Sequence, residues 1–173
     1  FTDANGEIPT SSDVDLILQQ LTYLNSSDTP PSLVQMSWTF DDGNSGSQGS
    51  GGALQIAGST NVSITAVNDA PTATIVASAY GVTEDDGYRF FGGISVADTD
   101  AGTNELAVTL SVNDGVTNLT GTTGLTFIAG ANDSDSMTFT GTLTNLNAAL
   151  ATFTYRPDAD FAGTDTLTLF VDD

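Results

Sequence analysis

The sequence of 173 residues lacks cysteine and histidine altogether and contains only two basic residues, Arg89 and Arg156. Zinc sites made of Cys and His, cysteine nucleophiles and histidine-based triads are therefore excluded, and disulfides cannot stabilise the fold. Two arginines cannot neutralise a row of phosphates, so nucleic acid is excluded as a partner. Apolar runs are short, and none approaches the ~20 residues of a membrane-spanning helix, so we expect no membrane insertion.

Acidic residues dominate the charge, because 22 Asp and Glu stand against two arginines and give a formal net charge of −20. A chain this acidic remains disordered when it has too few apolar residues. Here 39% of the residues are hydrophobic, and they fall in short alternating runs, which predicts a folded protein. The sequence starts at Phe1 and finishes in a strand-like run, so we expect both ends to be cut from a longer protein.

Runs rich in Thr, Val, Ile, Leu and Phe predict β-strands. Apolar and polar residues alternate within them, as at Val62, Ser63 and Ile64, which is the period of a half-buried strand. Gly, Asn, Asp and Pro separate the runs about every ten residues, a rhythm typical of an all-β sandwich. Asn113-Asp114-Gly115 predicts a hairpin turn. The predicted strands are 21–25, 32–40, 53–67, 72–78, 88–96, 106–112, 125–129, 136–142, 151–156 and 165–171.

Two stretches, 12–20 and 144–150, break this pattern with apolar residues at helical spacing, and each predicts one or two helical turns. They also belong to an internal repeat, because Leu18 and Tyr23 recur as Leu150 and Tyr155 after 132 residues. A shift of 131 residues carries Thr39-Phe40-Asp41-Asp42 onto Phe170-Val171-Asp172-Asp173.

The repeat predicts two domains. Residues 1–69 are expected to be the C-terminal part of one repeat, with a Gly/Ser loop at 41–52, and residues 70–173 a second repeat without its last strand. Open sheet edges pair with whatever strand is available. We therefore expect either that 53–67 completes a sheet of the second repeat, or that identical chains exchange strands head to tail into a fibre.

Acidic side chains gather in short motifs near predicted strand ends. Adjacent ionised carboxylates repel one another, so several at one module junction are costly without a cation. Ca²⁺ accepts six to eight oxygens from carboxylates, Asn side chains and backbone carbonyls, whereas softer metals prefer the His or Cys that are missing here. The alternative is that these are turn residues whose side chains bond local N–H groups. The motifs are 68–71, 82–86, 97–104, 41–42 and 172–173.

Two of these motifs resemble the calcium-binding segments of cadherin repeats. Asn68-Asp69-Ala70-Pro71 is similar to the cadherin linker, and Asp98-Thr99-Asp100 is similar to the Asp-x-Asp segment, with Gly102 and Asn104 following it. The closer resemblance is to the cadherin-like tandem repeats of giant secreted bacterial surface adhesins, and it covers most of residues 67–173. The motifs that carry it are Thr83-Glu84-Asp85, 95–102, Gly124-Leu125-Thr126-Phe127, 138–143, 147–150, Thr154-Tyr155-Arg156-Pro157 and 161–167.

The resemblance implies Ig- or cadherin-like Greek-key β-sandwich repeats, secreted to the bacterial cell surface and rigidified by Ca²⁺. It implies that Asn68, Asp69, Asp98 and Asp100 bind the ion at the junction between repeats, with Asn104 acting through its backbone. Acidic ligands from the first repeat are expected from Asp41 or Asp42, because Thr65-Ala66-Val67 is neutral. Glu84 and Asp85 are expected at the opposite end of the module, near Asp172 and Asp173, where they would serve the next junction.

Two functions remain open at this point. The first is a calcium-binding structural or adhesive module of a cell-surface adhesin or extracellular fibre, as in a biofilm matrix, with neighbouring repeats or identical subunits as partners. The alternative is a carbohydrate-binding module of a secreted polysaccharide-degrading system, with glycans as partners. That alternative needs exposed aromatic rings, and Tyr80, Tyr88, Phe90 and Phe91 form the one cluster. An enzyme is not expected, because aromatic residues are dispersed and a two-carboxylate glycosidase site usually also carries basic residues.

Overall fold

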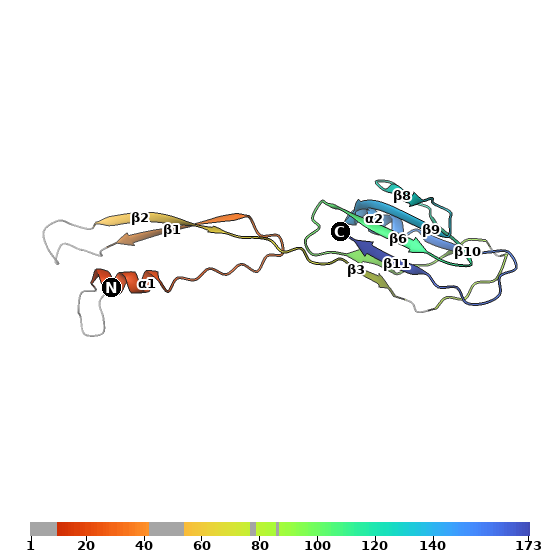
Figure 1. Ribbon diagram of the computed structural model, residues 1–173, viewed down its shortest axis with the longest axis horizontal. Helices are drawn as coiled ribbons and strands as arrows, with labels where there is room; N and C mark the ends of the chain where they lie inside the picture. The colour runs from red at the N-terminus through yellow and green to blue at the C-terminus, as the bar shows by residue number, and fades with distance from the viewer. Residues whose placement is uncertain (1–9, 42–53, 77–78, 86) are drawn as a thin grey trace. The chain divides into compact units, whose positions relative to one another are not determined.

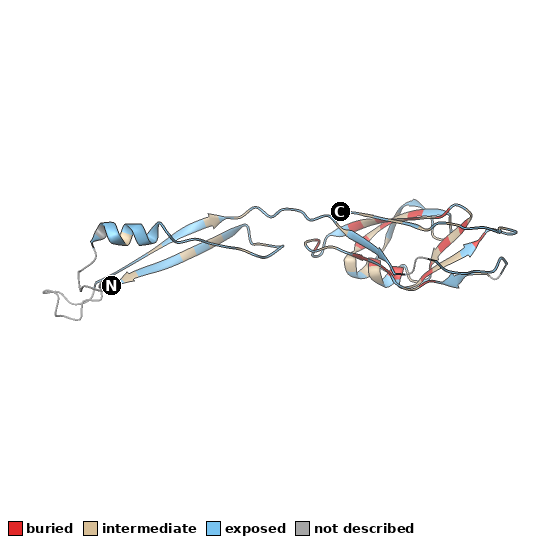
Figure 2. Cartoon of the chain, turned by 90° about the horizontal axis from the view of Figure 1, so that it is seen from below, coloured by how far each residue is buried: buried red, intermediate tan, exposed pale blue. Residues whose placement is uncertain are grey.

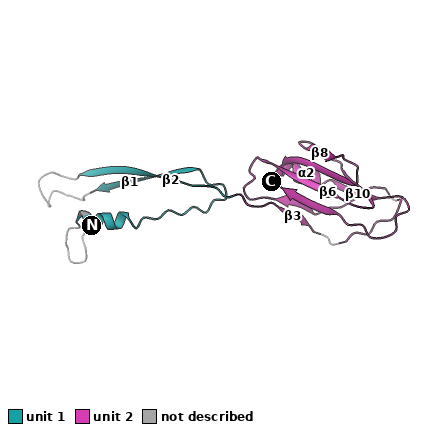
Figure 3. Cartoon of the chain, in the orientation of Figure 1, with its two compact units in different colours: residues 1–67 teal, residues 68–173 magenta. Residues whose placement is uncertain are grey.

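Figure 1 shows a computed structural model of the chain, which describes residues 10–41, 54–76, 79–85 and 87–173. The chain divides into two compact units, Phe1–Val67 and Asn68–Asp173 (Figure 3). Over the described ranges, the secondary structure consists mostly of antiparallel strands with two short helices. The predicted all-β class is therefore confirmed.

Unit 1 contains one helix and one hairpin. Helix α1 (Ser11–Leu18) begins after Thr10, whose hydroxyl accepts a hydrogen bond from the backbone N–H of Asp13, while the Asp13 carboxylate accepts one from the backbone N–H of Thr10. This reciprocal capping satisfies two of the N–H groups that a helix start leaves free. Strands β1 (Leu33–Asp41) and β2 (Gln55–Ser63) pair antiparallel over nine residues each. The Gly/Ser loop predicted at 41–52 lies outside the described residues beyond Asp41.

The hairpin of unit 1 has an apolar face that is only partly covered within the described part of the unit. Trp38 and Phe40 point to the same side of β1, and their cross-strand partners on β2 are Gly58 and Ile56. No described residue of unit 1 is buried, and the side chain of Ile56 is 62% exposed (Figure 2). The described part of unit 1 therefore has strands with the pattern of a half-buried sheet but contains no buried core.

Unit 2 contains the remaining strands in three sheets. β3 (Thr72–Ile75) pairs with β5 (Ile94–Ala97). β4 (Arg89–Phe90), β10 (Phe153–Pro157) and β7 (Gly115–Leu119) form a second sheet in that order. The third sheet has the order β11 (Thr168–Asp172), β6 (Glu105–Ser111), β9 (Ser136–Thr142) and β8 (Thr126–Gly130). Helix α2 (Leu143–Leu150) directly follows β9 and packs on β5 and β9.

A single apolar cluster joins these elements. Alternate residues of β6 and β9 point into it, and the side chains of Val108, Leu110 and Phe139 are completely buried. Leu150 from α2 and Phe153 from β10 pack against them. Full burial of one such side chain stabilises a fold by roughly 1.5–3 kcal/mol, so this cluster is the main source of stability in unit 2.

The strand predictions were correct in most places, but three strand predictions and one hairpin prediction were wrong. Segment 88–96 is split between β4 and β5, and β7 was missed because Gly115 and Asn118 weaken its strand pattern. Asn113-Asp114-Gly115 is not a hairpin, because β6 and β7 belong to different sheets. Segment 21–25 is not a strand. In the repeat, segment 21–25 corresponds to β10, which pairs with β4 on one side and β7 on the other. The described part of unit 1 contains no strand that corresponds to β4 or to β7.

The two helices show what burial adds to the same local sequence. They occupy equivalent positions of the repeat, and each follows a threonine cap, Thr10 or Thr142. Leu150 at the end of α2 is 0% exposed, whereas its counterpart Leu18 is 38% exposed. Local sequence therefore forms both helices, but only α2 has strands to pack against in the described structure.

This difference predicts the effect of a matched pair of substitutions. Leu150→Ala should lower the free energy of unfolding of unit 2 by about 2–5 kcal/mol, because it removes buried methyl groups and leaves a cavity. Leu18→Ala, in unit 1, should change the free energy of unfolding of unit 2 by less than about 0.5 kcal/mol, since Leu18 is partly exposed and does not belong to the apolar cluster. Urea unfolding followed by circular dichroism measures both, and equal losses would contradict the assignment of the core to unit 2.

Candidate functional site

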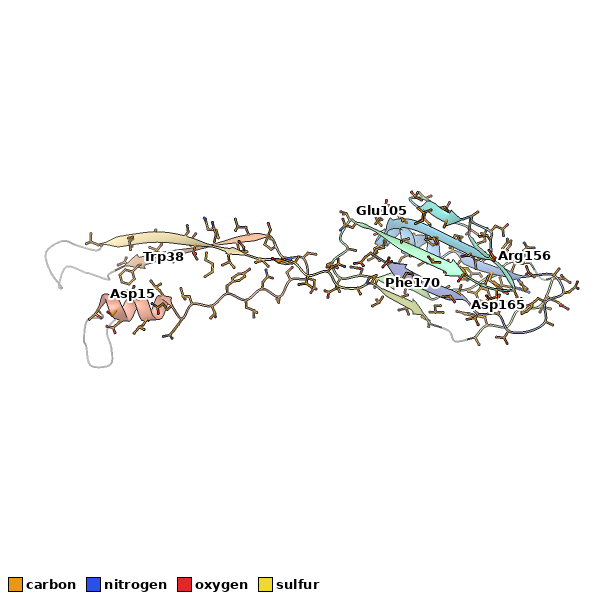
Figure 4. All side chains as sticks on the ribbon, viewed as in Figure 1. Asp15, Trp38, Glu105, Arg156, Asp165 and Phe170 are labelled. Atoms are coloured by element: carbon orange, nitrogen blue, oxygen red, sulfur yellow. The ribbon has the colours of Figure 1, made fainter. Side chains whose placement is uncertain are left out.

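Strand directions bring three acidic segments to one end of unit 2. Residues 68–71 lead into β3, whose first residue, Thr72, lies opposite Ala97 at the end of β5. Residues 98–104 then lead into β6. β11 runs antiparallel to β6 and places Asp172 opposite Ala107, near the start of β6. In Figure 4, Glu105 marks this end of unit 2 and Asp165 the opposite end.

Hydrogen bonds join the three segments. The backbone N–H of Asp69 donates to Oδ2 of Asp100 at 3.2 Å, and the hydroxyl of Thr99 donates to Oδ2 of Asp69 at 3.2 Å. The side-chain amide of Asn68 donates to Oδ2 of Asp173. Asp69 therefore lies close to Asp100, and Asn68 connects the linker to Asp173, although these residues are far apart in the sequence.

Asp98 holds the loop after β5 in a tight turn. Its Oδ1 accepts hydrogen bonds from the backbone N–H of Asp100 at 2.9 Å and of Ala101 at 2.7 Å. Burial by itself would raise the pKa of Asp98, but these hydrogen bonds outweigh it and lower the pKa below its usual value. Because its pKa is lowered, Asp98 is ionised at neutral pH. The turn ends with a hydrogen bond from the backbone N–H of Asn104 to the carbonyl of Ala101 at 2.8 Å.

Two carboxylate oxygens in this loop have no hydrogen-bond partner among the described residues. Oδ2 of Asp98 and Oδ1 of Asp100 are both buried, and no donor in the described ranges reaches either one. A buried acceptor without a donor typically costs about 1–3 kcal/mol, and more if it is charged. The two oxygens belong to carboxylates only two residues apart, so their charges also repel. A bound cation would remove both costs.

The donor set at this end of unit 2 suits a hard cation. It consists of carboxylate oxygens from Asp69, Asp98, Asp100 and Asp173 and the amide of Asn68, which are ligand types that Ca²⁺ accepts in flexible geometry. Within the part of the chain that the structure describes, no three acidic side chains already converge in the arrangement of a metal site. The types of ligand present therefore suit Ca²⁺, but the described side chains are not arranged around an ion in this structure.

The remaining predicted ligands lie elsewhere. Glu84 and Asp85 form an exposed turn, in which Asp85 has a positive φ of 62°. Asp41 ends β1 in unit 1 and accepts a hydrogen bond from the side-chain amide of Gln55. Asp42 lies outside the described residues.

The expectation that Asp172 and Asp173 lie with Glu84 at the opposite end was wrong. Asn68 contacts Asp173, so this carboxylate belongs to the same end as the linker. The reason is strand direction. β11 runs antiparallel to β6 and ends beside the start of β6, which is the end of unit 2 where the linker lies. Glu84 instead shares a cavity with Asp165.

Sequence reasoning missed a second carboxylate network at that opposite end. Oδ1 of Asp165 accepts a hydrogen bond from the backbone N–H of Asn113 at 3.0 Å. Oδ2 accepts one from the backbone N–H of Asp114 at 3.0 Å and one from the hydroxyl of Tyr155 at 2.9 Å. The network fixes the segment that crosses from β6 to β7. Both Tyr155 and Asp165 lie in motifs that carry the family resemblance, but nothing in the sequence indicated their contact.

The environment of this network shifts both of its ionisable groups. Burial by itself would raise the pKa of Asp165, but the backbone hydrogen bonds and the Tyr155 hydroxyl together lower it. Burial, followed by the hydrogen bond and the charge of Asp165, raises the pKa of Tyr155. Tyr155 therefore stays neutral and serves as a hydrogen-bond donor, which is a structural role.

A cavity of about 890 Å³ lies beside the network. Residues 79–84 line one part of it and residues 161–167 another. Buried apolar side chains also line it, among them Phe91, Ile94 and Phe153. The cavity is thus an opening onto the core of unit 2.

The aromatic cluster is only partly available to a ligand. Phe91 is buried and Phe90 is exposed, as strand alternation predicted. The ring of Tyr80 meets Phe91 edge-on at 4.5 Å between centroids, and the guanidinium of Arg156 lies 5.1 Å from the ring centroid of Tyr88. The exposed rings of Tyr80 and Tyr88 therefore each contact another side chain, Phe91 and Arg156 respectively, which leaves the ring of Phe90 as the most available one.

Comparison with known proteins does not extend this picture. No protein-family model matches the chain, and no curated protein or solved structure is significantly similar to it. The resemblance to cadherin-like repeats therefore rests on the sequence motifs alone. Neither helix in the described ranges has the length and apolar character needed to span a membrane.

The Asp165 network predicts a pH-dependent contribution to stability. A lowered carboxylate pKa contributes stability above the unfolded-state value of about 3.9, and the contribution is lost as the pH falls through the lowered folded-state value. Asp165→Asn should therefore cost about 1–2 kcal/mol of unfolding free energy at pH 7, because an amide NH₂ replaces a carboxylate oxygen that accepts hydrogen bonds in this partly exposed network. Its deficit relative to the wild type should shrink toward pH 3. Urea titrations across this range measure the effect. Asp160→Asn, at an exposed position, is the control, and a deficit independent of pH would refute the assignment.

Proposed function

We propose that the chain is a calcium-binding structural or adhesive repeat of a bacterial cell-surface adhesin or extracellular fibre. The observation that carries the proposal is the pair of buried oxygens, Asp98 Oδ2 and Asp100 Oδ1, which no donor from the described part of the chain reaches. They lie in the loop that resembles the cadherin Asp-x-Asp segment. The proposal includes secretion, because Ca²⁺ is plentiful outside cells.

The fold type belongs to the same proposal. We infer that unit 2 is a Greek-key β-sandwich of cadherin type, with its sheets packed face to face. Supporting this are the antiparallel pairing throughout, the crossing from β6 to β7 between two sheets, and the one core to which the sheets contribute. The repeat makes unit 1 part of a second such module.

In the proposed site, Asp69, Asp98 and Asp100 would supply carboxylate oxygens. Asn68 and Asp173 would add oxygens from the linker and the end of β11, and Asn104 would contribute through its backbone. When bound, Ca²⁺ would neutralise the repulsion among these groups. The chain itself already connects linker and loop through the hydrogen bond from Asp69 to Asp100.

This arrangement explains how an acidic chain can make a stiff joint. Pro71 has a fixed φ and favours extended backbone at Ala70, so the linker is restricted before any ion binds. Pinning Asn68 and Asp69 to the loop at 98–104 would fix the direction in which the chain leaves unit 2. A series of such joints would make a rigid extended fibre, and removing Ca²⁺ would loosen each one.

Calcium should raise the melting temperature of unit 2. At a free concentration one hundred times the dissociation constant, one site adds about 2.7 kcal/mol, which corresponds to roughly 10 °C for a domain of this size. Asp98→Asn combined with Asp100→Asn should abolish the difference between calcium and EGTA. Melting followed by circular dichroism, with calorimetric titration, measures both effects.

A matched control removes two charges elsewhere. Asp133→Asn combined with Asp135→Asn changes an exposed loop by the same net charge, and this variant should keep the full response to calcium. An unchanged wild-type melting temperature at millimolar calcium would reject the calcium proposal. So would an equal loss of the response in both double variants.

The alternative, a carbohydrate-binding module, has Phe90 and the exposed part of Tyr88 as its best surface. The guanidinium of Arg156 at the ring of Tyr88 and the burial of Phe91 weaken it, because a sugar-binding platform needs several free coplanar rings. We expect a glycan array to give no binding that Phe90→Ala abolishes. A specific glycan lost in that variant would make this the better function.

A further inference from the structure

Strand β5 leads directly into the acidic loop (residues 98–104), and it pairs along one edge with β3. Its other edge pairs with no strand among the described residues. Val96 lies in this strand, two residues before Asp98, and it is only 3% exposed. Buried backbone N–H and C=O groups need hydrogen-bond partners, so those of Val96 need a partner that is not a strand.

A side chain of helix α2 supplies that partner. Oδ1 of Asn147 accepts a hydrogen bond from the backbone N–H of Val96 at 2.9 Å, and Nδ2 of Asn147 donates one to the carbonyl of Val96 at 2.8 Å. Opposite residues of two antiparallel strands exchange the same pair of bonds, so the Asn147 amide takes the place of a third strand at this point. We call these two bonds the Asn147 clamp.

A third hydrogen bond fixes the orientation of the amide. Nδ2 of Asn147 also donates to the carbonyl of Leu143, one turn earlier in α2, at 3.0 Å. The side chain therefore uses its acceptor and both of its N–H groups, and a reversed amide would place an oxygen against two carbonyls. An ionised aspartate of the same shape has no N–H to donate, so it could not form the clamp.

The internal repeat indicates that helix formation does not require this asparagine. A shift of 132 residues places Asp15 of α1 at the position of Asn147 (Figure 4). Helix α1 forms with Asp15 exposed to solvent. The asparagine in unit 2 is therefore needed for the contact with β5 rather than for the helix itself.

The clamp connects the start of the acidic loop to the core of unit 2. Leu146 and Leu150 of α2 are both 0% exposed, so the helix that carries Asn147 is anchored by its apolar face. On the other edge of β5, β3 is exposed along its whole length. Without the clamp, the backbone just before Asp98 would be held only by β3 and by the packing of the Val96 side chain.

We propose that Asn147 is a positioning residue for the acidic loop, which it holds in a calcium-binding arrangement through the backbone of Val96. The inference rests on the proposed function, because this loop carries the two buried oxygens of Asp98 and Asp100. Ionised carboxylates two residues apart repel each other, so a loop released from its anchor would separate them, and a cation would have to bring them together again. Residues that orient metal ligands typically change the affinity by roughly 10–100-fold when they are replaced.

The chain contains a matched control for this residue. Oδ1 of Asn132 accepts a hydrogen bond from the backbone N–H of Leu119 at 2.8 Å, and Nδ2 of Asn132 donates one to the carbonyl of Leu119 at 2.9 Å. Leu119 ends β7, which belongs to a different sheet from β5, and it is as well buried as Val96. Alanine at either position removes the same pair of bonds, but only the Asn147 pair lies beside the acidic loop.

Asn147→Ala should raise the dissociation constant for Ca²⁺ about tenfold or more, whereas Asn132→Ala should change it by less than about twofold. Calorimetric titration of the full chain with Ca²⁺ measures both values. Melting in EGTA measures the stability that each variant loses, so that a loss of affinity is separated from a loss of stability. Equal losses of affinity in the two variants would overturn the assignment.

Hydrogen exchange in EGTA, followed by NMR, tests the positioning without calcium. The amide protons of Asp100 and Ala101 donate to Asp98, and they should exchange about tenfold faster in Asn147→Ala but at the wild-type rate in Asn132→Ala. Unchanged exchange in Asn147→Ala would overturn the proposal. Asn147→Ser, which keeps a polar group beside Val96, repeats the comparison with a smaller loss of stability and covers the case in which the alanine variant does not fold.

The two experiments separate this inference from the function on which it rests. A wild type that binds no Ca²⁺ would reject the proposed function and the calcium part of the inference. The exchange rates in EGTA would still decide whether Asn147 positions the acidic loop. Calcium binding that is equally tight in the wild type and in Asn147→Ala would keep the proposed function and reject the role of Asn147.

Discussion

A β-strand with one apolar face needs two things at once: a neighbouring strand for its backbone and a second layer over its side chains. In unit 2 both needs are met, because β6 lies between β11 and β9 while α2 and β10 close over Val108, Leu110 and Phe139. In unit 1 only the first is fully met in the described structure, since β1 and β2 pair along their length but leave Trp38 and Ile56 partly exposed. The contrast between the units follows from this one constraint.

The acidic end of unit 2 shows the same logic applied to charge. The Asp98 turn satisfies one carboxylate oxygen with two backbone N–H groups and leaves the other buried without a donor. Asp165 at the opposite end is different, because both of its oxygens accept hydrogen bonds from backbone or from Tyr155. The two carboxylates thus have different roles. Asp165 fixes the crossover between two sheets, whereas Asp98 is suited to an added ion.

Part of the candidate site follows from local sequence. Asn68 and Asp69 stand before β3 and Asp98 and Asp100 after β5, so antiparallel pairing of these neighbouring strands brings them together. The position of Asp173 did not follow, because it depends on which strand β11 pairs with and in which direction. The contact of Asp165 with Tyr155 was equally hidden, since it requires the crossover from β6 to β7 that Asn113-Asp114-Gly115 seemed to mark as a hairpin.

Sequence alone determined the all-β class, the two capped helices and the repeat, because alternation, capping residues and self-similarity are properties of short segments. Tertiary structure decided which copies of those segments are buried. Leu18 and Leu150 have the same place in the repeat and both end a helix, yet only Leu150 meets a core. The physical reason is that burial depends on neighbours supplied by distant parts of the chain, and no local pattern records whether those neighbours are present.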